Sequence, residues 1–226
     1  MLGLNGLALD DQNAELEEKR KEWRQAPDFL KLTLTNKSEI LAVREKKTFA
    51  ERLVFISQHK DRGNTLCQDG QYEAAVAEYT ESLGVLLWFY LPNGKHSEEI
   101  PLFSGYKEFE SAEDVALAQE SLQVILLNIA HCLNKLCSWE ASIYACTYTL
   151  RLDRYNIKAL YRRAVAYYGQ GTSYTLDQAV EDLLQANSID PEDKQVAKLL
   201  SKYFKEKVQQ DRYVVRFKLQ VRYKLV

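Results

Sequence analysis

A helix-turn-helix pattern recurs along this chain, and its spacing constrains the fold more than any other feature. In the first copy, over residues 56–83, the small residues Gly63 and Ala75 stand where two antiparallel helices must approach closely. The same plan recurs around Ala130 and again around Ala164, 34 residues further on. Such a period is typical of repeat proteins, in which each unit buries its apolar face against its neighbours.

A period of 34 residues is that of the tetratricopeptide repeat (TPR), a pair of antiparallel helices. The chain has only 9 Gly and 4 Pro among 226 residues, and this scarcity of helix breakers favours helices. We predict an all-α TPR solenoid of three repeats that ends in a capping helix. The TPR domain, the three repeats and the capping helix are expected over residues 48–210, 56–91, 119–153, 157–190 and 192–210.

Two features depart from a plain array of repeats. The first and second repeats are 67 residues apart, almost two periods, so the connection between them is lengthened. We expect the flanking helices to run past the usual repeat length, through the apolar run 83–91 and again over 112–135. In the third repeat an inserted turn should form a surface loop, followed by a capping box of Thr175 and Gln178.

The two ends of the chain lie outside the repeats. Residues 1–47 form an extension that we expect to be partly helical, over 13–25, and to pack on the repeats as a cap. It is followed by a capping box of Thr48 and Glu51, which begins the first long helix. In the basic tail, 211–226, apolar residues alternate with polar ones, which favours an extended strand. A frayed basic tail, or an imperfect continuation of the last helix, is the other interpretation.

Five polar residues occupy matching places in the first helices of the three repeats. Because first helices of successive TPR units line the inner wall, and residues four apart on a helix share a face, their side chains can converge in one groove. Lysine and arginine supply charge and asparagine supplies amide donors, a combination that suits a terminal residue with two carboxylates. The five residues are Lys60, Asn64, Asn128, Lys158 and Arg162.

Three motifs carry a family resemblance. KDRGN at 60–64, LLNIAHCL at 126–133 and KALYRRA at 158–164 resemble the TPR regions of co-chaperones that hold the C-terminal Met-Glu-Glu-Val-Asp tail of heat-shock protein 90. The long first connection most resembles the TPR regions of large immunophilins and of the aryl-hydrocarbon-receptor-interacting protein. The resemblance covers about residues 48–210 and implies a two-carboxylate clamp, whose five positions are all matched here. Those relatives usually carry a prolyl-isomerase-like domain before the repeats, for which residues 1–47 leave no room.

We therefore predict a TPR adaptor or co-chaperone that binds the acidic tail of heat-shock protein 90 or heat-shock protein 70. In this clamp Lys60, Asn64 and Asn128 hold the terminal main-chain carboxylate, while Lys158 and Arg162 address the acidic side chain and neighbouring carbonyls. An alternative is a TPR scaffold that binds another peptide segment in a multiprotein assembly, independently of chaperones. An unidentified client or assembly partner would contact the N-terminal extension or the C-terminal tail.

Other function classes have little support. His59, His96 and His131 are scattered, and no glycine-rich phosphate loop occurs, so we expect no enzyme activity, no metal and no cofactor. The formal net charge of −2 provides no overall attraction to nucleic acid, and no apolar run approaches the roughly 18 residues of a transmembrane segment. The four cysteines, which we interpret as reduced core thiols, indicate a cytoplasmic protein. They are Cys67, Cys132, Cys137 and Cys146.

Two further interpretations concern the third repeat. Arg163, next to Arg162, should point away from the groove on a helix and remain solvated or lie at the rim. Three tyrosines of the same helix, in contrast, are expected to pack in the core and along the groove rather than to form a ligand cage. These are Tyr161, Tyr167 and Tyr168.

Overall fold

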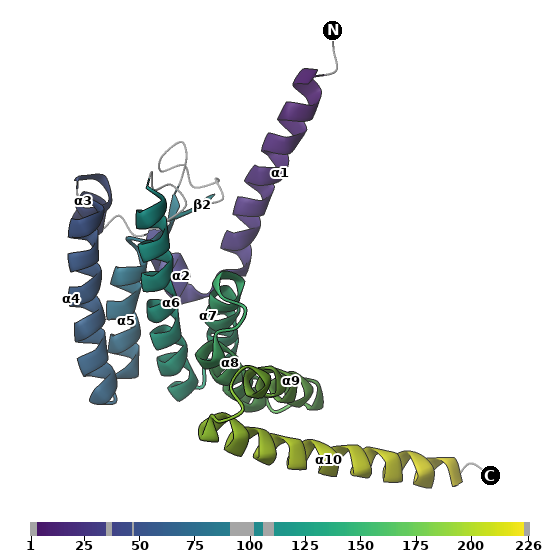
Figure 1. Cartoon of the computed structure of the whole chain (residues 1–226). Helices are drawn as coiled ribbons and strands as arrows, with labels where there is room; N and C mark the ends of the chain where they lie inside the picture. Colours follow the sequence, from purple (N-terminus) through teal and green to yellow (C-terminus); the bar gives the residue numbers. More distant parts are fainter. Residues whose placement is uncertain (1–3, 35–37, 47, 91–101, 106–110, 224–226) are drawn as a thin grey trace. The chain divides into compact units, whose positions relative to one another are not determined.

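The computed structural model describes residues 4–34, 38–46, 48–90, 102–105 and 111–223. The chain divides into two compact units, an N-terminal unit of residues 1–132 and a C-terminal unit of residues 133–226. Both units consist mainly of helices, and each is described separately below (Figure 1).

Where the structure describes it, the N-terminal unit contains several helices and a pair of strands. Its first elements are α1 (Leu4–Gln25), α2 (Asp28–Lys31), the short 3-10 helix η1 (Leu32–Leu34) and α3 (Ser38–Lys46). They are followed by α4 (Phe49–Gln68), α5 (Tyr72–Leu83), β1 (Leu87–Tyr90), β2 (Leu102–Gly105) and α6 (Ala112–Lys135), whose last three residues belong to the C-terminal unit.

The first repeat is the hairpin of α4 and α5, which run side by side (Figure 1). The predicted capping box begins α4: the Glu51 backbone N–H donates to the Thr48 hydroxyl, and the Glu51 carboxylate accepts from the Thr48 backbone N–H at 2.9 Å. Gly70, with φ of 76°, turns the chain in the left-handed conformation that glycine adopts without strain. The sequence prediction for this hairpin is confirmed.

The apolar run 83–91 does not extend a helix, as we had expected from its composition. Instead, α5 ends at Leu83, and β1 pairs with β2 in an antiparallel register that places Phe89 opposite Phe103. The sequence of β1, Leu-Trp-Phe-Tyr, is rich in aromatic residues, which favour strands. The connection over 91–101, which includes Pro92-Asn93-Gly94, lies outside the described residues.

The N-terminal extension packs against α5 and the strand pair, in agreement with the expected cap. Phe29, Leu30 and Ile40 are buried. The guanidinium of Arg44 donates to the carbonyl oxygens of Gly84 at 2.6 Å and Thr33 at 2.9 Å, which ties α3 to the end of α5. The predicted helical segment 13–25 is part of α1.

Helix α6 has the bounds that the sequence predicted. In the described part of the chain it is the one helix that is long and apolar enough to cross a membrane by length and composition, and 44% of that stretch is buried inside the protein. A core helix of a soluble protein meets the same criteria of length and composition, so this finding does not decide whether α6 crosses a membrane. The absence of a transmembrane segment therefore stays a prediction.

The C-terminal unit contains α7 (Trp139–Leu152), α8 (Ile157–Gln170), α9 (Ser173–Ile189) and α10 (Lys194–Tyr223). Apolar side chains of α8, α9 and α10, among them Leu160, Leu183 and Tyr203, form one buried cluster. The tyrosines of α8 pack against this cluster as predicted, and the ring of Tyr168 stacks on that of Tyr203 with centroids 4.0 Å apart. Helices α8 and α9 thus form the hairpin of the third repeat, and α10 closes it.

The capping box of α9 lies three residues earlier than we predicted. The N-cap is Thr172, whose hydroxyl accepts from the Thr175 backbone N–H at 3.1 Å, and the Thr175 hydroxyl accepts from the Thr172 backbone N–H at 3.2 Å. The prediction paired Thr175 with Gln178 because a capping box usually ends in Glu or Gln. Here a second threonine hydroxyl takes the role of that side chain.

The tail is helical as far as it is described, so the interpretation of 211–226 as a strand is wrong. Figure 1 shows α10 as one continuous helix that runs to Tyr223. No Gly or Pro follows Pro191, so nothing in the sequence interrupts the helix, whereas a strand would need a partner edge. Lys207 forms ion pairs with Asp177 of α9 and, one turn further on, with Asp211. Residues 224–226 lie outside the described residues.

Candidate functional site

Three of the five predicted ligand-binding residues belong to the N-terminal unit. Lys60 and Asn64 lie one turn apart on α4 and so share a face, while Asn128 lies on α6. The Asn128 amide nitrogen Nδ2 donates to Oδ1 of Asn64 at 3.3 Å. The structure therefore brings the two asparagines together, whereas the convergence of all five residues in one groove stays a prediction.

A fourth residue of this unit completes the arrangement. The hydroxyl of Tyr79, on α5, donates to the same Oδ1 of Asn64 at 2.8 Å. Because an amide oxygen has two lone pairs, these two bonds use the acceptor capacity of Asn64. The NH2 group of Asn64 is the part that can serve a ligand, and it is a donor only.

Close helix packing places the Tyr79 hydroxyl beside Asn64. The ring of Tyr79 is buried, and a Cβ atom built on Gly63 would lie only 2.6 Å from it. Only glycine leaves room for the ring at this point. The sequence marks Gly63 as a packing residue, but it gives no sign that a tyrosine hydroxyl of α5 contacts Asn64.

The other two predicted residues, Lys158 and Arg162, belong to the C-terminal unit and lie one turn apart on α8. Lys158 is exposed and Arg162 is half-buried. The N-cap Asn156 begins α8 by accepting from the Ala159 backbone N–H at 3.0 Å. The amide of Asn134 donates to the main-chain carbonyl of Arg162 at 2.9 Å, which holds this turn of the helix.

Arg163 is not the solvated residue that the sequence suggested. Its guanidinium donates to both carboxylate oxygens of Asp182 on α9, at 2.7 and 2.8 Å, and to the hydroxyl of Thr147 on α7 at 3.2 Å. The side chains of Arg163 and Asp182 are 19% and 7% exposed. The prediction was wrong because the partner of Arg163 comes from the next helix of the repeat.

Burial and pairing shift the pKa values of both partners of this ion pair. Burial opposes the charge of Arg163, but the hydrogen bonds and the negative charge of Asp182 outweigh it and raise the pKa of Arg163. Burial also raises the pKa of the Asp182 carboxyl, and the hydrogen bonds from Arg163 act in the opposite direction. The charge-assisted, bidentate pairing with Asp182 fixes α8 against α9, and the hydrogen bond to Thr147 fixes it against α7.

The cysteines only partly match the expected core thiols. Cys132 and Cys146 are buried, and burial raises the pKa of the Cys146 thiol to about 12. Cys67 is half-buried. Cys137 is exposed and has a positive φ of 56°, because it lies in the turn between α6 and α7 and not inside a helix.

The histidines give no support to a metal site among the residues that the structure describes. Nδ1 of His59 lies 2.8 Å from the Glu78 carboxylate, and His96 lies outside the described residues. Across the described ranges, no group of three or more His, Cys, Asp or Glu side chains is placed to hold a metal ion. The absence of a metal or cofactor stays a prediction.

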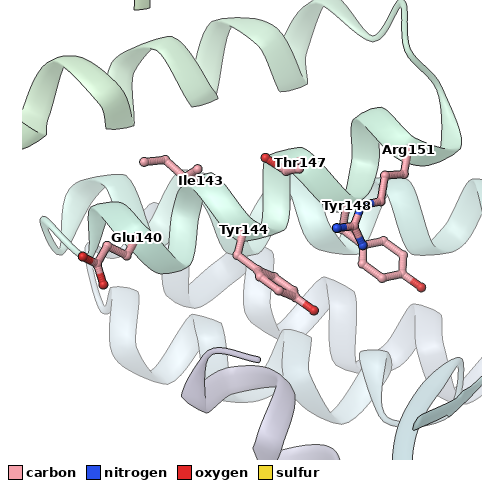
Figure 2. Close-up of a pocket in the computed structure, with 6 residues that line it drawn as sticks. All are labelled: Glu140, Ile143, Tyr144, Thr147, Tyr148 and Arg151. Carbon is pink, nitrogen blue, oxygen red and sulfur yellow. The ribbon is translucent and has the colours of Figure 1, made fainter. Parts of the chain in front are cut away.

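A separate pocket of about 250 Å³ lies along α7, and its lining includes none of the five predicted residues. Figure 2 shows Tyr144 and Tyr148 on one side of the helix, and Ile143 and Thr147 on the other. Thr147 also accepts the hydrogen bond from Arg163. The remaining lining residues are Glu140 and Arg151.

Comparisons with known proteins identify the fold. No protein-family model matches the chain. Sperm-associated antigen 1 of Mus musculus is 27% identical over 180 residues, a match that covers 77% of this chain and 16% of that protein. The chain therefore spans about a sixth of the length of this relative.

Two solved structures are similar in three dimensions. The C-terminal TPR-containing domain of a putative FK506-binding protein from Plasmodium falciparum has a TM-score of 0.58 and 23% identity, over 74% of this chain and 97% of that one. The Hsp90 co-chaperone Cns1 of Saccharomyces cerevisiae has a TM-score of 0.57 and 19% identity, over 77% and 46%. The chain has a TPR fold, and the predicted fold class is confirmed.

Proposed function

We propose that this chain is a TPR adaptor that binds the acidic C-terminal tail of heat-shock protein 90, or of heat-shock protein 70, by its free carboxylates. Its fold is similar to that of an Hsp90 co-chaperone, and residues of the types needed for a carboxylate clamp occur at matching repeat positions. It binds and does not catalyse, and it acts in the cytoplasm.

The observation that carries this proposal is the pair of amides in the N-terminal unit. Asn64 and Asn128 contact each other, and Asn64 has its oxygen occupied, so it can only donate to a ligand. Lys60, one turn away on α4, adds a positive charge. A group that accepts hydrogen bonds and carries negative charge, such as a terminal carboxylate, is the ligand that suits these donors.

The cations of the C-terminal unit suit a second carboxylate. Lys158 and Arg162 share one face of α8, and a side-chain carboxylate of the last residue would accept from both. An internal peptide segment lacks the main-chain carboxylate, so both groups together select a chain end. That selection separates this function from the alternative, a scaffold that binds an internal segment.

A calorimetric titration with a Met-Glu-Glu-Val-Asp peptide and its C-terminally amidated twin tests the proposal. The free-acid peptide should bind more tightly, and raised salt should weaken it because the attraction is between charges. Replacement of Lys158 by Ala should cost about 1.5–3 kcal/mol of binding free energy, the range for hydrogen bonds to charged groups.

The matched control is Lys198→Ala, which removes an exposed lysine from α10. It should leave the affinity unchanged. Equal affinity for the acid and the amide, or equal effects of the two lysine variants, would contradict the clamp and favour the scaffold.

A further inference from the structure

Tyr79 contacts a proposed ligand-binding residue although its own side chain is only 1% exposed. Its hydroxyl donates to Oδ1 of Asn64 at 2.8 Å, and Nδ2 of Asn128 donates to the same oxygen at 3.3 Å. The three side chains come from α5, α4 and α6, so the contact joins three helices of the N-terminal unit.

The direction of these hydrogen bonds matters because an amide has two different ends. A reversed Asn64 would direct its NH2 group at the NH2 group of Asn128, and two donors would then face each other at 3.3 Å. The observed orientation avoids this and gives the Tyr79 hydroxyl an acceptor. Tyr79 and Asn128 therefore both favour the same orientation of the Asn64 amide.

We propose that Tyr79 is a specificity-determining residue, which keeps Asn64 as a hydrogen-bond donor and so makes the site prefer a free carboxylate to a carboxamide. This inference rests on the proposed function, in which Asn64 binds the terminal carboxylate. A carboxylate only accepts hydrogen bonds, whereas a terminal carboxamide also carries an NH2 group that needs an acceptor. With its oxygen occupied, Asn64 does not supply one.

The packing explains why the tyrosine hydroxyl is held in place. A Cβ atom at Gly63 would lie within 2.6–2.9 Å of three atoms of the Tyr79 ring, so the ring fills the space beside α4 and has little freedom to move. A buried ring that cannot swing fixes its hydroxyl as well. The hydroxyl is thus a rigid donor toward Asn64.

The test is Tyr79→Phe, which keeps the ring and removes only the hydroxyl. Its affinities for the free-acid and amidated Met-Glu-Glu-Val-Asp peptides are compared with those of the wild type. The preference for the acid should fall about 10-fold, the effect of one lost hydrogen bond, through weaker binding of the acid and equal or tighter binding of the amide, because the Asn64 oxygen is then open to the NH2 group of the amide. A general structural defect would instead weaken both peptides alike.

Tyr168→Phe is the matched control, because it removes the hydroxyl that donates to Glu206 at 2.9 Å in the C-terminal unit. It should leave the preference for the acid at the wild-type value. If the wild type prefers the acid and Tyr79→Phe prefers it equally, the inference is overturned. A wild type without any preference would contradict the proposed function itself.

A second variant covers the case in which Tyr79→Phe fails to fold. Asn64→Asp keeps an oxygen that can accept from Tyr79 and Asn128, and it removes the NH2 group offered to the ligand. The preference for the acid should disappear in this variant, because a second carboxylate would repel the ligand. Retention of the preference would overturn the assignment of Asn64 as the donor.

Discussion

The two units orient their proposed binding residues by different means. In the N-terminal unit the contacts are between neutral groups: the Tyr79 hydroxyl and the Asn128 amide both donate to the side-chain oxygen of Asn64. In the C-terminal unit, the helix that carries Lys158 and Arg162 is fixed by a buried ion pair, Arg163 with Asp182. In both units a residue of the second helix of the hairpin, Tyr79 of α5 or Asp182 of α9, contacts the first helix, which carries the proposed binding residues.

The difference predicts how each unit responds to change. A neutral hydrogen bond contributes about 1 kcal/mol net to stability, so its removal should act mainly on ligand preference. A buried ion pair that loses one partner leaves an uncompensated charge, so its disruption should act on folding first. The following predictions test this contrast.

The largest effect is expected for Asp182→Ala. Arg163 would keep its charge while its side chain is only 19% exposed, and we expect the free energy of unfolding to fall by about 3–5 kcal/mol. Denaturant unfolding followed by circular dichroism measures the change.

The control for this prediction replaces both partners by apolar residues, as in the double variant Arg163→Met with Asp182→Leu. Because neither charge is then buried alone, most of the stability should return. A loss as large in the double variant as in Asp182→Ala would show that shape, and not charge, sets the cost.

An intermediate effect is expected for Gly63→Ala in the N-terminal unit. The added methyl group would lie 2.6 Å from the buried Tyr79 ring, and overpacking of this kind costs about 1–3 kcal/mol, partly offset by the better helix propensity of alanine. A fall in the thermal unfolding midpoint is the expected result.

Gly169→Ala is the comparison in the C-terminal unit. The added methyl group would also lie 2.6 Å from a ring, that of Trp139, but this side chain is half-buried at the first residue of α7 and can move aside. Its destabilisation should be clearly smaller. Equal costs at both glycines would show that the Tyr79 ring is no more constrained than that of Trp139.

The smallest effect is expected at the helix caps. Thr48→Ala and Thr172→Ala each remove the side-chain acceptor of a capping box, at α4 and at α9, and each should cost about 1 kcal/mol. If the units unfold separately, each variant should lower the midpoint of its own transition only. Serine at either position keeps the hydroxyl and should retain the wild-type stability. If the serine variant is as unstable as the alanine variant, the loss comes from the methyl group of threonine and not from the cap.

Local signals predicted the repeats well. The capping box at Thr48 and the small residues at Gly63, Ala130 and Ala164 each depend on a few neighbouring positions, so they could be recognised without a structure. The capping box at Thr172 was missed because threonine rarely replaces Glu or Gln there. The strand β1 was missed because a short apolar run does not distinguish a strand from a buried helix end, and its partner β2 follows only at Leu102.

The site was predicted less completely than the fold. The choice of five polar residues follows from the repeat period, but the contact between Asn64 and Asn128 came only from the structure. The convergence of the five residues on one ligand stays a prediction. Tyr79 and Asp182 were missed for a shared reason. Each acts across a helical hairpin on a residue more than ten positions away, and no local pattern in the sequence marks such a pairing.

The strand pair between the first two repeats has a practical consequence. Trp23 of α1 meets the ring of Phe89 edge-to-face at 5.0 Å, and α2 with its buried Phe29 and Leu30 contacts α5 and β1. A truncated protein that begins at the first repeat would lose Trp23, Phe29 and Leu30 and would expose Phe89 to solvent. Such a product should be prone to aggregation, so the leading helices belong in any shortened version intended for binding studies.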